Sequence, residues 1–223
     1  MPRLYEGTPW EQHKQKWIDC SLCPLCEVRK HVVLYRGNIP CHVLFIGEAP
    51  GDGEDVLGKP FQGPAGKLLD QQIAEALHNL GSSVDSGGST PDGKFIDVWQ
   101  PMELRIGFTN LVCCIPKDAK GGKKVGEPPK ESIAACHPRL TELVHLVKPK
   151  MIVLVGDLAK KEIVGQAHFS YEDGELPWLH GNEFLEFISI THPAAILRAE
   201  IVRRELMYQR VVVTLENVFR ELT

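Results

Sequence analysis

The chain has 223 residues, of which 43% are hydrophobic and 24% are charged. This is the composition of an ordinary folded domain, and it excludes a disordered chain, a collagen and a long coiled coil. The sequence contains no run of about 18 uncharged apolar residues, so we expect no transmembrane helix and no membrane partner. The first 19 residues are too charged for a secretory signal, which favours a cytoplasmic protein, nucleoid-associated if it meets DNA.

The charged side chains are unevenly distributed. The net charge is −4, with 25 basic and 29 acidic residues, and this balance alone does not indicate nucleic-acid binding. Residues 114–130, however, hold five lysines and two acids, whereas residues 48–55 hold four acids and no base. A basic loop beside an acidic one would suit a nuclease, a glycosylase or a phosphate-handling enzyme, although two solvated loops have the same composition.

The expected elements alternate between helix and strand along the chain. A helix over residues 10–19 begins after Thr8 and Pro9, and a continuous apolar strand follows at 41–47. A Gly- and Pro-rich loop over 47–66 leads to a helix at 67–80, a polar tract at 81–94 and a strand at 104–113. A loop is expected at 117–129 and a helix at 130–147. Strands at 150–156 and 184–190 and a terminal helix at 200–222 complete the expected elements.

Apolar strands that alternate with helices are typical of a mostly parallel sheet covered on both faces. We therefore predict an α/β fold with three layers, α/β/α, around a central four-stranded sheet, in a single domain over residues 1–223. Ligands in such folds bind at the loops that follow the strands. Three of these loops, at 48–66, 114–129 and 191–198, carry unusual residues, which raises the expectation of a site there.

The seven cysteines favour metal or redox chemistry over disulfides, because nothing in the sequence indicates secretion. They stand at positions 20, 23, 26, 41, 113, 114 and 136. A C-x-x-C places two thiolates on one turn, and the later cysteines could complete a four-thiolate site for zinc or for an iron–sulfur cluster. Cys41 begins an apolar strand and is expected to be a buried small side chain.

Four other residues stand out on the loops and strand ends. Glu48 lies in an acidic turn that could position a water molecule or a cation, and His192 follows a strand, where acid or hydrogen-bond chemistry is well placed. Phe61 could stack on a planar ring or plug the core, and Asn110 could read the edge of a pyrimidine or cap a turn. The segment around Lys67 is not a nucleotide P-loop, because no Ser or Thr follows that lysine.

Taken together, these segments resemble the iron–sulfur (family-four) uracil-DNA glycosylases of the uracil-DNA glycosylase superfamily. The sequence GEAPG at 47–51, then Glu54-Asp55, then GKPFQGPAGKLL at 58–69 resembles the first motif of that family. Thr109-Asn110 followed by Cys114 resembles the middle motif, and HPAAILR at 192–198 resembles the last. The motifs occur in order, from about residue 20 to the terminal helix.

The resemblance implies a 4Fe–4S cluster held by Cys20, Cys23, Cys114 and Cys136, with Cys113 as a competitor for the third place. The cluster in this family would pin the N-terminal segment and the basic loop to the core, without breaking the glycosidic bond itself.

The resemblance also implies a monomeric enzyme that flips uracil out of single- or double-stranded DNA and hydrolyses its N-glycosidic bond, leaving an abasic site for base-excision repair. Phe61 would stack on the flipped base, and Asn110 would hydrogen-bond its polar edge and separate uracil from cytosine. His192 would donate to the uracil O2 as negative charge develops there. Glu48 would hold the attacking water or favour the cationic sugar.

Further residues near the substrate are implied by the same resemblance. Glu54 would have a supporting role, and Ala49 stands where the best-known uracil glycosylases have a catalytic Asp, so that it cannot act as a base. Arg198 and the lysines at 117–124 would hold phosphates and make DNA binding depend on salt.

The sequence departs from the family in two places. Residues 81–100 look like an insertion, and the 114–136 loop is extended and basic. Relatives that trap uracil covalently use a His in such a loop, and this loop has none, so we expect turnover rather than a covalent adduct. Two alternatives stay open: a glycosylase of this fold for another deaminated or modified base, and a non-catalytic DNA-binding member of the superfamily.

Overall fold

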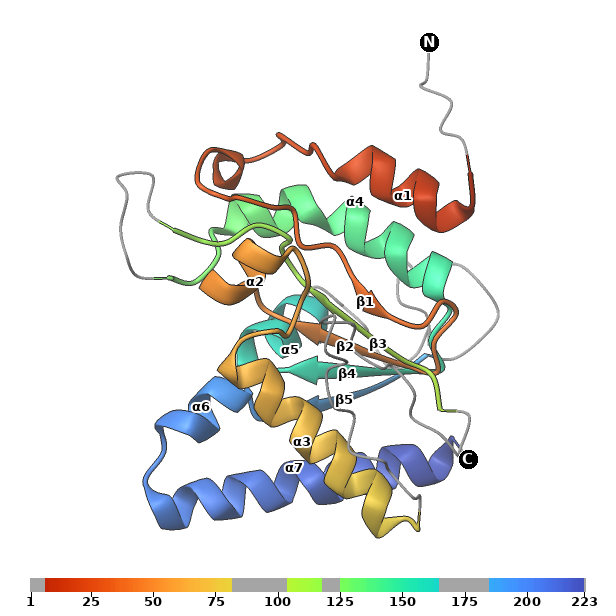
Figure 1. The fold of residues 1–223 in the computed structure, drawn as a ribbon, viewed down its shortest axis with the longest axis vertical. Helices are drawn as coiled ribbons and strands as arrows, with labels where there is room; N and C mark the ends of the chain where they lie inside the picture. Colours follow the sequence, from red (N-terminus) through yellow and green to blue (C-terminus); the bar gives the residue numbers. More distant parts are fainter. Residues whose placement is uncertain (1–6, 82–103, 118–124, 165–184, 223) are drawn as a thin grey trace.

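A central sheet of five strands organises the computed structural model, which describes residues 7–81, 104–117, 125–164 and 185–222. The strand order is β1-β3-β2-β4-β5, and all neighbours are parallel except β1 and β3 (Figure 1). The strands are β1 (Arg36–Gly37), β2 (Val43–Gly47), β3 (Ile106–Asn110), β4 (Met151–Val155) and β5 (Glu186–Ile190). The predicted α/β fold and its four parallel strands are confirmed, and the predicted strand count is corrected to five by the short antiparallel β1.

Helices cover both faces of the sheet, as the apolar strands require. One face packs against α1 (Pro9–Trp17), α4 (Lys130–Val147) and α5 (Asp157–Val164). The other packs against α3 (Pro64–Asn79), α6 (Pro193–Arg198) and α7 (Ile201–Glu221). Successive side chains of a strand point to opposite faces, and β2, β3 and β4 are buried throughout, so each contributes to both cores. Among the described helices, none is both long and apolar enough to cross a bilayer.

The long elements lie close to their predicted ranges, whereas the short helices after the strands were expected to be loops. α2 (Asp52–Leu57), α5 and α6 have six to eight residues each, too few for a helical period to stand out. α3 begins three residues before the predicted start, with Pro64 at its first position, where proline needs no hydrogen-bond donor. The proposed insertion at 81–100 lies outside the described residues, apart from Gly81.

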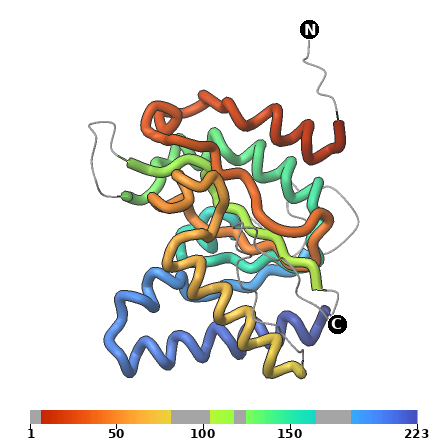
Figure 2. The backbone as a smooth tube through the Cα atoms, in the orientation of Figure 1, coloured from red at the N-terminus to blue at the C-terminus, as the bar shows by residue number. Residues whose placement is uncertain are grey.

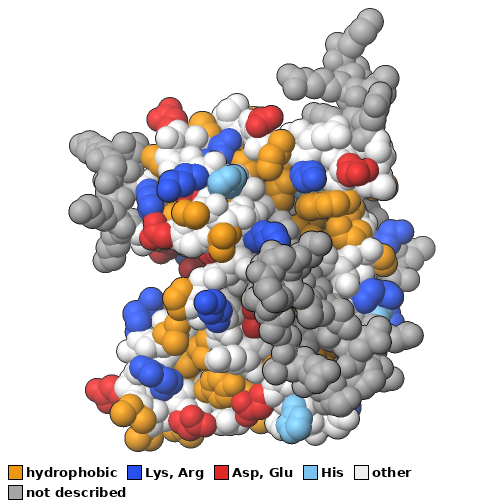
Figure 3. Space-filling view, in the orientation of Figure 1, with side chains coloured by type: hydrophobic (Ala, Val, Ile, Leu, Met, Phe, Trp, Pro, Cys, Tyr) orange, Lys and Arg blue, Asp and Glu red, His pale blue; other side chains and the backbone are white. Residues whose placement is uncertain are grey.

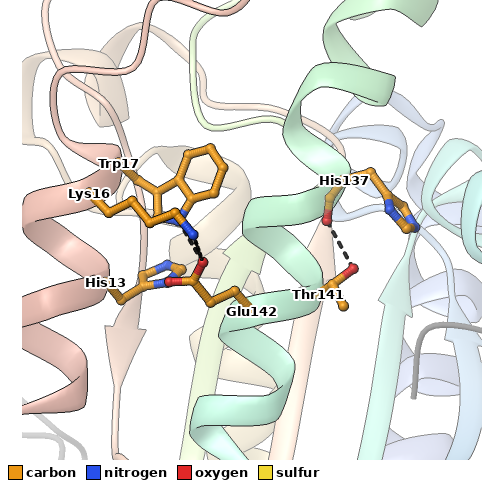
Figure 4. Close-up of polar contacts among 6 residues, drawn as sticks. All are labelled: His13, Lys16, Trp17, His137, Thr141 and Glu142. Atoms are coloured by element: carbon orange, nitrogen blue, oxygen red, sulfur yellow. Dashed lines mark hydrogen bonds and ion pairs between the residues drawn. The ribbon is translucent and has the colours of Figure 1, made fainter. Parts of the chain in front are cut away.

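The N-terminal helix is anchored to α4 by one carboxylate (Figure 4). Glu142 accepts hydrogen bonds from Lys16 Nζ at 2.5 Å, His13 Nδ1 at 2.9 Å and Trp17 Nε1 at 3.3 Å. Burial opposes ionisation of Glu142, but the bonds from Lys16 and His13 prevail and lower its pKa. The segment that follows α1, with the 3-10 helix η1 (Pro24–Glu27), is therefore held beside the start of α4 (Figure 2).

Candidate active site

A pocket of about 480 Å³ opens where β4 and β5 end. Its wall includes Glu48 after β2, Gly156 and Asp157 after β4, and Ser189, His192 and Arg198 from β5, the turn after it and α6. Figure 3 shows the molecule hollowed at this edge, between the parts that hold α2 and α6, with acidic side chains inside the hollow. Two of the three loops expected to carry the site, 48–66 and 191–198, thus meet at the carboxyl ends of the strands, whereas no described residue of the 114–129 loop lines the pocket.

Gly156 brings the two predicted catalytic side chains together. A Cβ at this position would lie 2.7 Å from Glu48 Oε1 and 3.1 Å from both Cβ and Cδ2 of His192. The glycine also has φ +98°, a left-handed conformation that side chains disfavour. The absence of a side chain at Gly156 therefore lets Glu48 and His192 approach each other across the end of β4.

His192 presents a neutral imidazole to the pocket. Its Nδ1 accepts a hydrogen bond from the backbone N–H of Ala194 at 3.1 Å and so caps the N-terminus of α6. Burial, together with the charge of Arg198, lowers the pKa of His192 to about 4. Because Nδ1 is the acceptor, the ring proton is on Nε2, which can donate a hydrogen bond to a ligand.

Glu48 lies at the other side of Gly156 and has a raised pKa. Burial is the main cause, and the nearby carboxylates Glu127 and Asp157 add to it. The backbone N–H of Leu158 and the charge of Arg198 act in the opposite direction. A half-buried carboxylate with few compensating charges is a stronger proton acceptor than a solvated one, which suits a group that holds or deprotonates water.

Asn110 and Phe61 meet at a second glycine, the residue before Glu48. A Cβ on Gly47 would lie 2.4 Å from Asn110 Oδ1 and 2.7 Å from Phe61 Cζ. The amide nitrogen of Asn110 is buried without a hydrogen-bond partner in the described part of the chain. A buried amide N–H₂ without an acceptor is costly unless a ligand supplies one, so this side chain fits a role in ligand recognition.

The ring of Phe61 is more enclosed than a free stacking platform. It is 5% exposed, and its centroid lies 5.6 Å from that of Phe108 in a tilted arrangement. Its backbone has φ +56°, which is strained for a side chain of this size. The ring thus packs against the core, as one of the two predictions for Phe61 has it, and its edge reaches Gly47 beside Asn110, whereas stacking on a base stays a prediction.

Glu54 and Ala49, both predicted to lie near the substrate, are not in the pocket wall. The carboxylate of Glu54 accepts the backbone N–H of Gly51 at 2.5 Å, and the backbone of Phe61 and Gln62 also donates to it. Glu54 therefore ties the start of α2 to the strained turn at Phe61. Ala49 packs against the core on the α4 face of the sheet.

Four cysteines from three distant segments gather beside the N-terminus of α4. Cys20 and Cys23 pack against the core cluster that contains Cys114 and Cys136, and all four thiols interact electrostatically. Burial raises the pKa of Cys114 to about 12 and also raises that of Cys136. In the described residues, no three side chains of the metal-binding types are already arranged around one point.

The surroundings of these thiols suit an anionic sulfur centre. Arg29 Nη1 and Ser132 Oγ are buried donors without a partner in the described residues. Arg29 interacts with Cys114, and Ser132 lies one turn before Cys136 on the same face of α4. Thiolate or sulfide sulfur would accept hydrogen bonds from both, so the donor set fits an iron–sulfur cluster. Cys113, which is 2% exposed, lies in the same buried cluster as Cys114 and Cys136 and also interacts electrostatically with Cys20, Cys114 and Cys136, so it stays a competitor for the third ligand position. Cys26 is only partly buried.

The basic loop returns close to the acidic turn. Lys117 forms an ion pair with Asp52 at the start of α2, and it pairs with Val125 across the base of the loop. Most of the lysines expected to contact phosphate lie at 118–124, outside the described residues. Arg198 lines the pocket and is exposed, as a phosphate contact requires.

The sequence did not point to Asp157, Ser189 or Arg139 as site residues. The first two line the pocket, and Arg139 holds the end of β3, where Asn110 stands. The position after an apolar strand was a usable signal for Asp157. Nothing local marks Arg139, because its partners are about 30 residues away in the sequence.

Comparison with known proteins places these motifs in one family. The sequence profile of the uracil DNA glycosylase superfamily matches residues 34–216. A Type-4 uracil-DNA glycosylase of Saccharolobus solfataricus is 32% identical over 194 residues, which cover 84% of this chain and 76% of the relative. Proteins of the same name from Pyrobaculum aerophilum and Thermotoga maritima are 32% and 29% identical; the matches cover 84% and 80% of this chain, and 84% and 78% of the relatives. The pocket, the two glycine contacts and this similarity over most of the chain lead to one conclusion: the protein belongs to the uracil-DNA glycosylase superfamily.

Proposed function

We propose that the protein is a uracil-DNA glycosylase that cleaves the N-glycosidic bond of deoxyuridine in DNA. The observation that carries this proposal is the pairing of a neutral His192 with a buried Glu48 across Gly156 in one pocket. The relatives that are named Type-4 uracil-DNA glycosylases support the same activity.

The bond breaks with positive charge growing on the sugar and negative charge growing on the uracil. His192, held with its Nδ1 toward the Ala194 N–H, would donate from Nε2 to the uracil O2 as that charge develops. A donor held in place for such a charge is worth about 3 kcal/mol. A neutral imidazole serves here, because it donates one hydrogen bond and does not transfer a proton to a weakly basic leaving group.

Glu48 would act on the sugar side of the bond. As a carboxylate it can stabilise the cationic sugar and orient a water molecule toward C1′. The raised pKa makes this carboxylate a better acceptor for the proton that the attacking water loses. Ala49, the next residue, has no group that could take this role.

Asn110 and Phe61 would select the base. The unpartnered amide nitrogen of Asn110 would donate to a uracil carbonyl, and its Oδ1 would accept the N3–H, a pattern that cytosine does not match. Phe61 would contact the flipped ring with the edge that reaches Gly47. Both residues adjoin Gly47, directly before Glu48, so base recognition and hydrolysis would share one turn of the chain.

Cys20, Cys23, Cys114 and Cys136 would bind a 4Fe–4S cluster in this proposal. When bound, the cluster would supply a covalent cross-link among the N-terminal segment, the end of the β3 loop and α4. The buried, unpartnered donors at Arg29 and Ser132 support a centre that accepts hydrogen bonds there. The cross-link would hold β3, and with it Asn110, in register with α4.

DNA is the partner that this chemistry requires. We propose a monomer that acts in the cytoplasm, in association with the nucleoid. Arg198 at the pocket mouth would contact a phosphate beside the flipped nucleotide. Such contacts make DNA affinity fall with salt, by about one power of salt concentration for each neutralised phosphate.

The decisive experiment is a glycosylase assay on oligonucleotides with a single uracil, cytosine, thymine, hypoxanthine or methylated base. We expect alkali-labile product from uracil and no protein–DNA adduct on a denaturing gel. Product from another lesion alone would assign a different base to the pocket. Tight binding of uracil DNA with no abasic product would overturn the enzymatic proposal in favour of a DNA-binding module.

A further inference from the structure

Asn110 is the last residue of β3, and at this point the backbone leaves the sheet. The N–H of Leu111 still donates to the carbonyl of Gly47 at 2.9 Å. The carbonyls of Asn110 and Leu111 instead accept hydrogen bonds from a side chain of the helical layer. That side chain is the guanidinium of Arg139 on α4, whose Nη2 lies 2.6 Å from Asn110 O and 2.9 Å from Leu111 O.

The other end of the guanidinium fixes the residue before Asn110. Arg139 Nη1 donates to Thr109 Oγ1 at 2.9 Å, and the Thr109 hydroxyl donates to the carbonyl of Leu34 at 2.8 Å. One planar group thus holds three consecutive residues, 109–111. A lysine ammonium donates from a single atom and cannot bridge this span, whereas the guanidinium carries five donors in a fixed fork.

Arg139 is also a buried cation without a carboxylate partner. It is 2% exposed, and no acid in the described part of the chain forms an ion pair with it. Its Nε has no hydrogen-bond partner in those residues. A buried charge of this kind is expensive to keep, so its retention indicates a role that an apolar residue of similar volume cannot fill.

The neighbours of Arg139 on α4 connect it to the cysteines. Cys136 is three residues earlier and therefore lies on the same face of the helix. Arg139 interacts electrostatically with Cys136 and Cys113. One turn of α4 thus holds both a thiol of the four-cysteine group and the side chain that grips the end of β3.

We propose that Arg139 is a positioning residue for base recognition, which sets the orientation of the Asn110 amide by fixing the backbone on both sides of it. The proposal rests on the function proposed for Asn110. The amide must present Oδ1 and Nδ2 to matching atoms of the base, and a shift of its Cα moves both at once. A misplaced Asn110 amide should lower turnover rather than DNA affinity, since affinity comes mainly from phosphate contacts.

A double-mutant cycle tests this inference. Arg139→Lys in the otherwise native chain should lower kcat on uracil DNA by roughly 10- to 100-fold, with little change in DNA affinity. In the Asn110→Ala background the same substitution should have almost no further effect on kcat. Arg105→Lys is the matched control: Arg105 stands directly before β3, is exposed, and contacts His42 instead of Asn110.

Thr109→Val is the second variant, because Arg139→Lys alters a fully buried site and can lose its fold. It removes the hydroxyl that accepts from Nη1 and leaves both carbonyl contacts in place. We expect a smaller fall in kcat, which again disappears in the Asn110→Ala background. Thermal unfolding and iron content measured on every variant identify a loss of folded protein.

The outcomes separate the inference from the proposed function. An equal fall in kcat for Arg139→Lys in both backgrounds, or an unchanged kcat in the native background, would overturn the role of Arg139 alone. An Asn110→Ala variant with full activity would overturn the proposed role of Asn110 and this inference with it. A native chain without uracil excision would overturn the proposed function itself.

Discussion

The backbone N–H of Ala194 donates to Nδ1 of His192 at 3.1 Å, and this contact decides which proton the histidine can offer. A side chain that caps its own helix cannot turn without leaving the N-terminus of α6 unsatisfied. The orientation of the ring, its tautomer and its neutrality therefore follow from one local hydrogen bond and from burial in the pocket.

Replacement of His192 by alanine should remove the donor to the leaving base. We expect kcat to fall by about 10²- to 10³-fold, while affinity for uracil DNA stays close to that of the native chain. Single-turnover assays and fluorescence anisotropy measure the two quantities. The control is His137→Ala, on α4 and away from the pocket; an equal loss in that variant would contradict a specific role for His192.

The pH dependence of turnover should follow Glu48. Burial raises its folded-state pKa above the usual 4.5, so the carboxylate becomes protonated as the pH falls through that raised value. We expect an acid limb centred above pH 4.5 in kcat for the native chain. His192, with a pKa of about 4, stays neutral over this limb and does not contribute to it.

Substitution of Glu48 by glutamine tests this assignment. The residual activity of Glu48→Gln should be low and flat across the acid range, because no carboxylate remains to titrate. His192→Gln should be slow but retain the acid limb at the native position. An acid limb that disappears in the histidine variant instead would reverse the two roles.

The four-cysteine centre gives a prediction about neighbouring thiols. Cys114→Ser should lose bound iron and the visible absorbance of a cluster, whereas Cys113→Ala should retain both, because the middle motif that resembles the iron–sulfur glycosylases places the ligand at Cys114. Iron analysis and absorbance spectra of the purified variants provide the measurement. Cys26→Ser serves as a second control and should also retain iron. Loss of iron in the Cys113 variant but not in the Cys114 variant would make Cys113 the ligand in place of Cys114.

Phe61 contributes to both the core and the base site, so its replacement should have two effects. Phe61→Leu keeps an apolar side chain against Phe108 but removes the aromatic edge that the proposed function places against the base. With both effects expressed as free energies, we expect the loss in kcat/KM on uracil DNA to exceed the loss in the free energy of unfolding. Phe108→Leu is the matched variant. It should lower the free energy of unfolding more than it lowers kcat/KM.

The sequence predicted the parallel strands and the clustering of Glu48 and His192 for a clear physical reason. Buried strands are continuous apolar runs, and residues that follow parallel strands meet at one edge of the sheet. The same logic did not reveal β1, because a strand of two residues is too short to show a pattern of apolar residues. It also missed α2 after β2 and α5 after β4, because a helix of one or two turns is too short to show a helical period.

The contacts that position Asn110 were outside the reach of local pattern analysis. Arg139 looks like any arginine of an amphipathic helix, and only the packing of α4 on the sheet brings it to residues 109–111. Glu54 was expected beside the substrate, and the fold places its carboxylate under the turn at Phe61. Residues of a motif can thus serve the site by holding its backbone as well as by touching the ligand.

The short strand β1 has a consequence for the behaviour of the protein at high concentration. The outer side of β3 would otherwise present a row of free backbone donors and acceptors on which a strand from another molecule could assemble. Two antiparallel residues, Arg36 and Gly37, occupy that row opposite Phe108 and Gly107. Arg36 also forms an ion pair with Asp70 of α3 at 2.9 Å, which holds β1 in place. We therefore expect the middle of β3 to be a poor template for a strand from another molecule.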